Sequence, residues 1–317
     1  MNKSIIHHFR SRLRAREHLF LAVATAMACG TLTEVAHAQI FVPNYGNGNV
    51  GEYSTAGATI NASLLTGLTE AATIAAAGTS LFIETDSNDN IGKYTTAGAT
   101  VSATFITGTG TNEYGLALSG NTLFAARFGT GIVSEYNATT GALTGTISGL
   151  SEPTGLAVSG TTLYVANYST GTIGEYTTAG ATLSASFVTG LSGPWGLVVT
   201  GGDLYVMNEE ASGRVGVYNA TTGAVINSAL FSTGTTSYGL ALLGPNLLTA
   251  NFTAGTIGEY TTGGLTVNAS FITGLDEPVD LTVLSVIPES SAWAALAGGG
   301  VLALAVLRRR RRGQGRG

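Results

Sequence analysis

The chain has 317 residues, with 14 Lys and Arg against 19 Asp and Glu, a formal net charge of −5 and a single cysteine. Between residues 39 and 288 the balance is more acidic, with three basic residues against sixteen acids, or −13. One cysteine excludes an internal disulfide framework, and the acidity argues against nucleic acid or anionic lipid as a partner.

Residues 1–38 have the parts of a secretory signal peptide. A basic start precedes a largely apolar run from Leu19 to Leu32, and Ala36 and Ala38 form a small-x-small cleavage site. No twin-arginine pair precedes the apolar run. We therefore predict export by the general secretory route and a mature chain that begins at Gln39.

Cleavage there would leave a body without histidine or cysteine, because these residues all lie in the signal: His7, His8, His18, Cys29 and His37. Thiolate catalysis, Cys/His zinc sites and Ser-His-Asp triads are then excluded. Two alternatives for the segment are a lipidated Cys29 and a buried helix. Ala26 stands where lipidation usually requires leucine, and the charged start argues against a buried helix.

The body is a repeat array with a period of about 40 residues. Successive anchor tyrosines are 41, 42, 40, 42 and 42 residues apart: Tyr53, Tyr94, Tyr136, Tyr176, Tyr218 and Tyr260. A second anchor keeps the same period at Thr73, Gly115, Gly155, Gly196, Gly239 and Asp280. Two anchors with one period indicate six copies of one structural unit.

Each unit contains four short runs rich in β-branched and aromatic residues, separated by Gly, Asn, Ser and Thr. This pattern predicts an all-β, six-bladed β-propeller with four-stranded blades. The array starts with the second run of a unit, at 40–45, and ends with a first run, at 280–283. We therefore expect one blade to combine three N-terminal strands with one C-terminal strand. An open solenoid is the alternative, and it would need polar end caps.

Two segments of one repeat, Gly155-Leu-Ala-Val158 and Leu163-Tyr-Val-Ala-Asn167, resemble NHL-type six-bladed propellers. The resemblance covers residues 40–284 and implies the architecture, whereas one fold hosts many functions. Propellers of the gluconolactonase family hold a divalent metal through separated Glu, Asn and Asp residues. No such set aligns here residue by residue.

Four asparagines follow the second strand of their units: Asn44, Asn167, Asn208 and Asn251. Glu84 and Arg127 take slightly offset places in the other two units. Equivalent positions form a ring around a propeller axis, so these residues are candidates for a ligand-binding mouth. The neighbouring rings of Tyr45, Phe128, Tyr168 and Phe252 are candidates for stacking on sugars. Asn that fixes its own turn, and rings that pack between blades, are the alternatives.

Two further acidic patterns stand out. Glu52, Glu135, Glu175 and Glu259 each precede an anchor tyrosine, and their repetition favours an architectural or solubilising role over a catalytic carboxyl pair. The segment 86–90 partly resembles a calcium loop, which makes Asp86, Asn88 and Asn90 candidates for weak Ca²⁺ binding. A polar hairpin turn is the alternative, since Ile91 stands where the loop needs glycine.

The C-terminus reads as an export and retention signal. An apolar run, 292–307, is predicted to form a single transmembrane helix, and the arginines after it should stop transfer. This tail resembles the PEP-CTERM sorting signal through Ile287, Pro288, Glu289, Ser291, Trp293, Arg308, Arg309, Arg310, Arg311 and Arg312. Ser290 replaces the usual second proline. The resemblance implies an exosortase-type processing enzyme as a partner, and a buried helix is the alternative for the run.

Three parts are thus expected: a signal peptide at 1–38, a propeller at 39–285 and a sorting signal at 286–317. The favoured function is a non-catalytic binding or structural module of the cell envelope or exopolysaccharide matrix, with no nucleic acid partner. It would be held transiently at the inner membrane and then reach the cell surface or the medium. The alternative is a metal-dependent, lactonase-like hydrolase with a carboxylate and Asn site in the channel.

Overall fold

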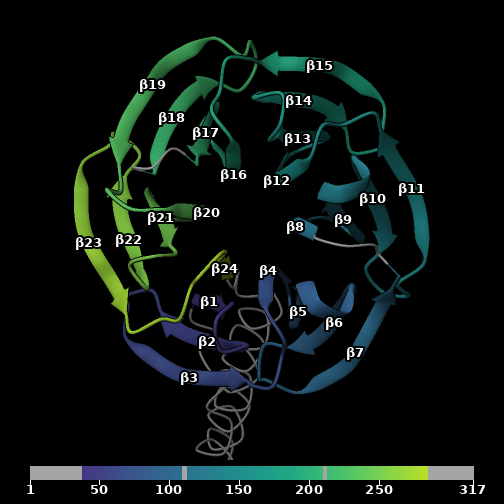
Figure 1. Cartoon of the computed structure of the whole chain (residues 1–317), viewed down its shortest axis with the longest axis vertical. Coiled ribbons are helices and arrows are strands. Elements are labelled where there is room, and N and C mark those ends of the chain that lie inside the picture. The colour runs from purple at the N-terminus through teal and green to yellow at the C-terminus, as the bar shows by residue number, and fades with distance from the viewer. Residues whose placement is uncertain (1–37, 109–112, 210–212, 285–317) are drawn as a thin grey trace, which may run out of the picture. The chain divides into compact units, whose positions relative to one another are not determined.

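The computed structural model describes residues 38–108, 113–209 and 213–284. In these residues six four-stranded antiparallel sheets stand around a common axis as a β-propeller (Figure 1). The predicted signal peptide, apart from residue 38, and the predicted sorting segment with its apolar run, 286–317, lie outside this part. Within the described residues, no helix has the length and apolar character needed to cross a bilayer.

The innermost strands, which surround the axis, are β24 (Thr282–Leu284), β4 (Ala71–Ala77), β8 (Glu113–Ser119), β12 (Pro153–Ser159), β16 (Pro194–Thr200) and β20 (Ser237–Leu243). The second strands are β1 (Gln39–Asn44), β5 (Ser80–Thr85), β9 (Thr122–Arg127), β13 (Thr162–Asn167), β17 (Asp203–Asn208) and β21 (Asn246–Asn251). We number the blades 1 to 6 in this order.

The third strands are β2 (Asn49–Ser54), β6 (Asn90–Thr95), β10 (Ile132–Asn137), β14 (Thr172–Thr177), β18 (Arg214–Asn219) and β22 (Thr256–Thr261). The outermost strands are β3 (Thr59–Leu65), β7 (Thr100–Thr107), β11 (Leu143–Ser148), β15 (Thr182–Val188), β19 (Val225–Ser232) and β23 (Thr266–Thr273). Two short 3₁₀ turns, η1 (Asp86–Asn88) and η2 (Phe128–Thr130), complete the described elements.

The predicted closure of the ring is confirmed. Blade 1 has the order β24-β1-β2-β3, so the C-terminal strand pairs with the N-terminal one, with Ile40 opposite Val283. Strand β24 begins at Thr282, two residues later than predicted, and the segment before it bonds to the end of β1 and to the residue after it. There Tyr45 N donates to Glu277 O at 3.2 Å, and Asp276 N donates to Asn44 Oδ1 at 3.0 Å.

The hydrophobic core lies between the faces of adjacent blades, in six separate clusters of the described residues. Five of the anchor tyrosines belong to these clusters, and all six, including Tyr260, keep 2–6% of their surface exposed. In the repeated Gly-x-Tyr segment the tyrosine ring folds over the glycine two residues earlier. A Cβ on Gly174, for example, would lie 2.6 Å from the Tyr176 ring, which explains why both residues recur together.

The second anchor marks the closest approach of the inner strands. A Cβ on Gly155 would lie 1.9 Å from the Trp195 carbonyl oxygen, so only glycine fits. In blades 1 and 2 the equivalent residues are Asp280 and Thr73, and they contact each other directly. Asp280 Oδ2 accepts bonds from Thr73 Oγ1 at 2.9 Å and from Ile74 N at 3.1 Å. A side-chain contact therefore replaces close backbone packing where the two ends of the array meet.

Candidate functional site

One end of the propeller axis collects side chains from every blade, because the same register position recurs in each sheet. The first residue after each second strand lies there, in the turn to the third strand. These six residues, the outer mouth ring, are Tyr45, Asp86, Phe128, Tyr168, Glu209 and Phe252. Four are aromatic and two are acidic, and all are half-buried.

A second ring lies at the same end, nearer the axis. It is formed by the residue before each second-anchor position, near the start of the inner strand. The inner mouth ring consists of Val279, Ala72, Tyr114, Thr154, Trp195 and Tyr238. Its aromatic members come from blades 3, 5 and 6. We call the twelve residues of both rings the mouth.

Trp195 is the centre of the aromatic contacts in the mouth. Its ring centroid lies 5.0 Å from that of Tyr114, 5.6 Å from that of Tyr168 and 4.8 Å from that of Tyr238. Phe128 extends the cluster, at 5.2 Å from Tyr114, and Phe252 does so at 5.5 Å from Tyr238. The rings are tilted or edge-to-face, the arrangement that aromatic pairs prefer, so four blades contribute to one continuous aromatic surface.

Carboxylates hold the phenol groups on both sides of this surface. Glu209 Oε1 accepts a hydrogen bond from Tyr238 Oη at 3.3 Å. Glu209 also bonds the Tyr168 hydroxyl, and this bond is the main cause that raises the pKa of Tyr168. Burial first and then Glu209 raise the pKa of Tyr238 to about 12. Both phenols therefore stay protonated at neutral pH and act as hydrogen-bond donors.

The opposite side of the mouth has a second acid and tyrosine group. Asp86 bonds both Glu84 and Tyr45, and burial raises the pKa of Asp86. Burial, followed by Asp86 and Glu70, raises the pKa of Tyr45 to about 12. The pKa of Tyr114 is raised by burial first and then by Asp86.

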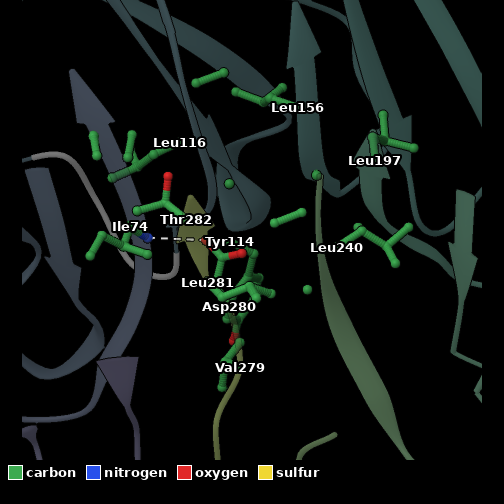
Figure 2. Close-up of a pocket in the computed structure, with 18 of the residues that line it drawn as sticks. Ile74, Tyr114, Leu116, Leu156, Leu197, Leu240, Val279, Asp280, Leu281 and Thr282 are labelled. Carbon is green, nitrogen blue, oxygen red and sulfur yellow. Dashed lines mark hydrogen bonds between the residues drawn. The ribbon is translucent and has the colours of Figure 1, made fainter. Parts of the chain in front are cut away.

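Below the mouth the central channel holds a cavity of about 330 Å³. Figure 2 shows Tyr114, Asp280 and leucines from several inner strands around it. One equivalent residue of each blade borders it, and these side chains also belong to the core clusters between the blades: Ile74, Leu116, Leu156, Leu197, Leu240 and Leu281. Trp195 and Tyr114 border both the cavity and the mouth. A ligand at the mouth thus meets aromatic rings above a channel whose surface is mostly polar.

Asp280 is the carboxylate in the wall of this cavity. Part of its surface borders the cavity, while protein surrounds it on the other sides, and this burial raises its pKa to about 6 from the usual 3.8. Bonds from Ile74 N, Leu281 N and Thr73 Oγ1 oppose the shift. The Asp280 carboxylate therefore helps to close the ring at the contact between blades 1 and 2.

The structure places the four predicted asparagines beneath the mouth, with only 2–5% of their surface exposed. Their amides bond within their own blades. Asn167 Oδ1 accepts from Ser151 N at 3.2 Å, Asn208 Oδ1 from Ser192 N at 3.3 Å, and Asn251 Oδ1 from Ser237 Oγ at 2.8 Å. These contacts fix the loop before the inner strand, which corresponds to the turn-forming alternative. Arg127 occupies the same register position in blade 3, whereas in blade 2 that position is Thr85 rather than Glu84.

The predicted calcium segment forms η1 and the start of β6 instead of a simple hairpin turn. Asp86 opens η1, Asn88 ends it, Asp89 follows in a left-handed conformation with φ 49°, and Asn90 pairs with Thr85. In the described part of the chain, no three His, Cys, Asp or Glu side chains gather as a metal site would require. Calcium binding through Asp86, Asn88 and Asn90 stays a prediction that calorimetry with Ca²⁺ can test.

The recurring glutamates lie on the third strands, away from the mouth. Glu259 Oε1 accepts from Asn246 Nδ2 at 2.7 Å, and Glu52 bonds Gln39, each at the strand end opposite the mouth. Burial raises the pKa of Glu52, Glu135 and Glu175. Their contacts match the architectural role expected from repetition.

Sequence reasoning did not single out Tyr114, Tyr238 and Glu209. The signal that identifies them is variation among the repeats. The anchors are nearly constant, whereas the mouth positions hold aromatic, acidic and small residues in different blades. Repeats that share a fold but differ at one end of the axis create an asymmetric surface there.

No protein-family model matches the chain, and no curated protein matches it in sequence. Solved structures share its fold. A chain of a nidogen/laminin complex aligns with a TM-score of 0.62 and 14% identity, over 78% of this chain and 98% of that one. A catalytically inactive variant of virginiamycin B lyase from Staphylococcus aureus, solved with quinupristin, aligns with a TM-score of 0.57 and 14% identity, over 75% and 82%. At 14% identity these likenesses show a shared fold.

Proposed function

We propose that the protein is an exported, non-catalytic binding module whose mouth holds sugar rings of an envelope or matrix polysaccharide. The main observation behind the proposal is the aromatic surface centred on Trp195. It joins rings from four blades, and each ring centroid lies within 6.0 Å of at least one other. Aromatic faces stack on the apolar faces of sugars, and the carboxylate-held phenols beside them can hydrogen-bond hydroxyl groups.

Export and sorting belong to the same proposal. The signal peptide, the motif from Ile287 to Trp293 and the arginines Arg308–Arg312 support passage through the inner membrane, cutting by an exosortase-type enzyme and delivery to the surface or the medium. Deleting Arg308–Arg312 should leave unprocessed precursor in the membrane fraction. Normal maturation of that variant would count against the sorting route.

The binding role is tested by comparing Trp195→Ala with Phe231→Ala on a polysaccharide array and by calorimetry. Phe231 is a matched control because it is also half-buried and stacks on one ring, Tyr260 at 4.2 Å, but lies on an outer strand. We expect Trp195→Ala to lose binding and Phe231→Ala to keep it, with circular dichroism confirming that both are folded. Equal binding by both variants would refute the assignment of the mouth.

A hydrolase is the second candidate, and the observation that favours it is the Glu84–Asp86 pair beside Tyr45. Two neighbouring carboxyl groups can serve as acid and base. Glu84 has no exposed surface, however, so a substrate would reach only Asp86. The related lyase structure is inactivated by replacing one histidine, and this chain has none after His37. Turnover of lactones or glycosides that is lost in Asp86→Asn would establish the hydrolase.

A further inference from the structure

We propose that the mouth selects polysaccharides that carry free, protonated amino groups over neutral and uronate polymers. The inference rests on the proposed polysaccharide binding and adds the chemical class of the ligand. The observation behind this inference is that carboxylates lie beside the aromatic surface, above the channel cavity.

Glu209 is the central group of this argument. Its carboxylate lies between the hydroxyls of Tyr168 and Tyr238, and both rings contact Trp195. An ammonium group beside Trp195 would meet aromatic faces, which attract cations, and a carboxylate a few ångströms away. Neutral sugars gain only the stacking part of this interaction, and uronates are repelled by the carboxylate.

The loops that enter the inner strands add further carboxylates to this end of the propeller. Three glutamates hold left-handed backbone conformations there: Glu70 with φ 53°, Glu152 with φ 52° and Glu277 with φ 54°. The equivalent residue in blade 5 is Gly193, with φ 58°. Glycine adopts this conformation freely, whereas another residue loses about 1 kcal/mol. Glutamate is therefore placed in these loops against its conformational preference.

The same four loop residues are fixed from the mouth side. The backbone N–H of the outer-ring residue donates to each of their carbonyl groups, for example Tyr168 N to Glu152 O at 3.1 Å and Glu209 N to Gly193 O at 2.9 Å. Strained residues persist where surrounding structure fixes them, and they cluster at functional sites. The acidic loops are therefore bonded to the outer mouth ring and are not independent surface turns.

Acids outnumber basic residues at the mouth end of the described part. Lys93 Nζ donates to Ala138 O at 2.8 Å and lies over the rings of Phe82 and Phe105, at the end of the blades opposite the mouth. Arg127 and Arg214 are the basic residues at the mouth end. The acids at that end are Glu70, Glu84, Asp86, Glu152, Glu209 and Glu277.

The test uses full-length protein and four β-1,4-linked hexamers: glucosamine, N-acetylglucosamine, glucose and glucuronate. These probes share a linkage and differ in charge. From the size of exposed ion pairs and cation–π contacts, we expect glucosamine hexamer to bind about tenfold more tightly than the neutral hexamers. Added salt should reduce this preference. Glu209→Gln keeps an acceptor for Tyr238 and should abolish most of it.

The matched control is Glu259→Gln, which makes the same charge change on a half-buried glutamate at the opposite end of the blades. It should keep the preference. Equal affinity for glucosamine and glucose hexamers, or tighter binding of glucuronate, would overturn the charge selection while leaving polysaccharide binding intact. Loss of the preference in both variants would overturn the role of Glu209. Binding of none of the probes, nor of any polysaccharide on the array, would overturn the proposed function itself.

Discussion

Replacing Asp280 by Asn should change how stability depends on pH. Asp280 lies where the two ends of the repeat array meet, and its burial raises its pKa from 3.8 to about 6. A raised carboxyl pKa means that the folded state holds the proton more tightly than the unfolded state does. The resulting stabilisation is fully present below about pH 4 and is lost as pH rises through about 6.

The magnitude follows from the difference between the two pKa values. A change from 3.8 to about 6 corresponds to about 3 kcal/mol of unfolding free energy. Water in the channel cavity would reduce this figure, because Asp280 borders the cavity. Asn keeps one oxygen that can accept from Thr73 Oγ1 and Ile74 N, but its NH₂ cannot ionise. The variant should therefore lack the loss of stability that the native chain suffers between about pH 4 and 7.

Urea denaturation followed by tryptophan fluorescence, at a series of pH values from about 4 to 8, measures the effect. The stability difference between native chain and Asp280→Asn should shift by up to about 3 kcal/mol in favour of the variant as pH rises. Asp276→Asn, an exposed acid four residues earlier, is the control for net charge. Parallel pH curves for the native chain and Asp280→Asn would refute the burial argument. Other buried acids affect both curves equally and cancel in the difference.

Three further predictions concern the backbone conformation, the packing of the inner strands and the outer strands, and they use the same denaturation assay. Glu152→Gly should stabilise by about 0.5 to 1 kcal/mol because glycine suits its left-handed φ. Gly193→Ala should destabilise, both because of its left-handed φ and because its Cβ would lie 2.9 Å from the Tyr168 ring; opposite signs would contradict the strain argument. Gly155→Ala should lower the free energy of unfolding by about 3 kcal/mol, since the new Cβ meets the next blade. Gly263→Ala has room for a Cβ and should change stability little. Equal effects of the two substitutions would mean that the inner strands move to accommodate the Cβ. Leu183→Lys, at a side chain 56% exposed on an outer strand, should change stability by less than about 0.5 kcal/mol, and a larger loss would indicate a contact that the fold does not show.

Much of the fold could be predicted from the sequence because repetition reduces the problem to one unit. Two anchors with one period, the Tyr176 and the Gly155 types, fix the number of blades, and the phase of the array fixes the closure. These anchors have local physical causes. The tyrosine covers its own glycine, and the second glycine allows the inner strands to approach. The start of β24 was predicted two residues too early.

The candidate site was predictable only in part. The rings of Tyr45, Phe128, Tyr168 and Phe252 were identified beside the asparagines, but the asparagines themselves turned inward to their own loops. A buried amide and an exposed one have the same sequence pattern, so only the position of Ser151 and its equivalents distinguishes them. Trp195 could not be identified as the centre of the site, since its partners come from blades 3, 4 and 6, and no spacing in the sequence brings these together.

Symmetry provides the last argument for placing function at the mouth. A ring of identical blades would present six equal surfaces, and a ligand without sixfold symmetry could use only a part of them. At the anchors this chain keeps its blades nearly alike, because each interface must pack in the same way. At the mouth it places the half-buried rings of Tyr114, Trp195 and Tyr238 in three blades, and the fully buried Thr154 and Ala72 in two others. Variation of this kind, at one end of the axis, is what a surface for one asymmetric ligand needs.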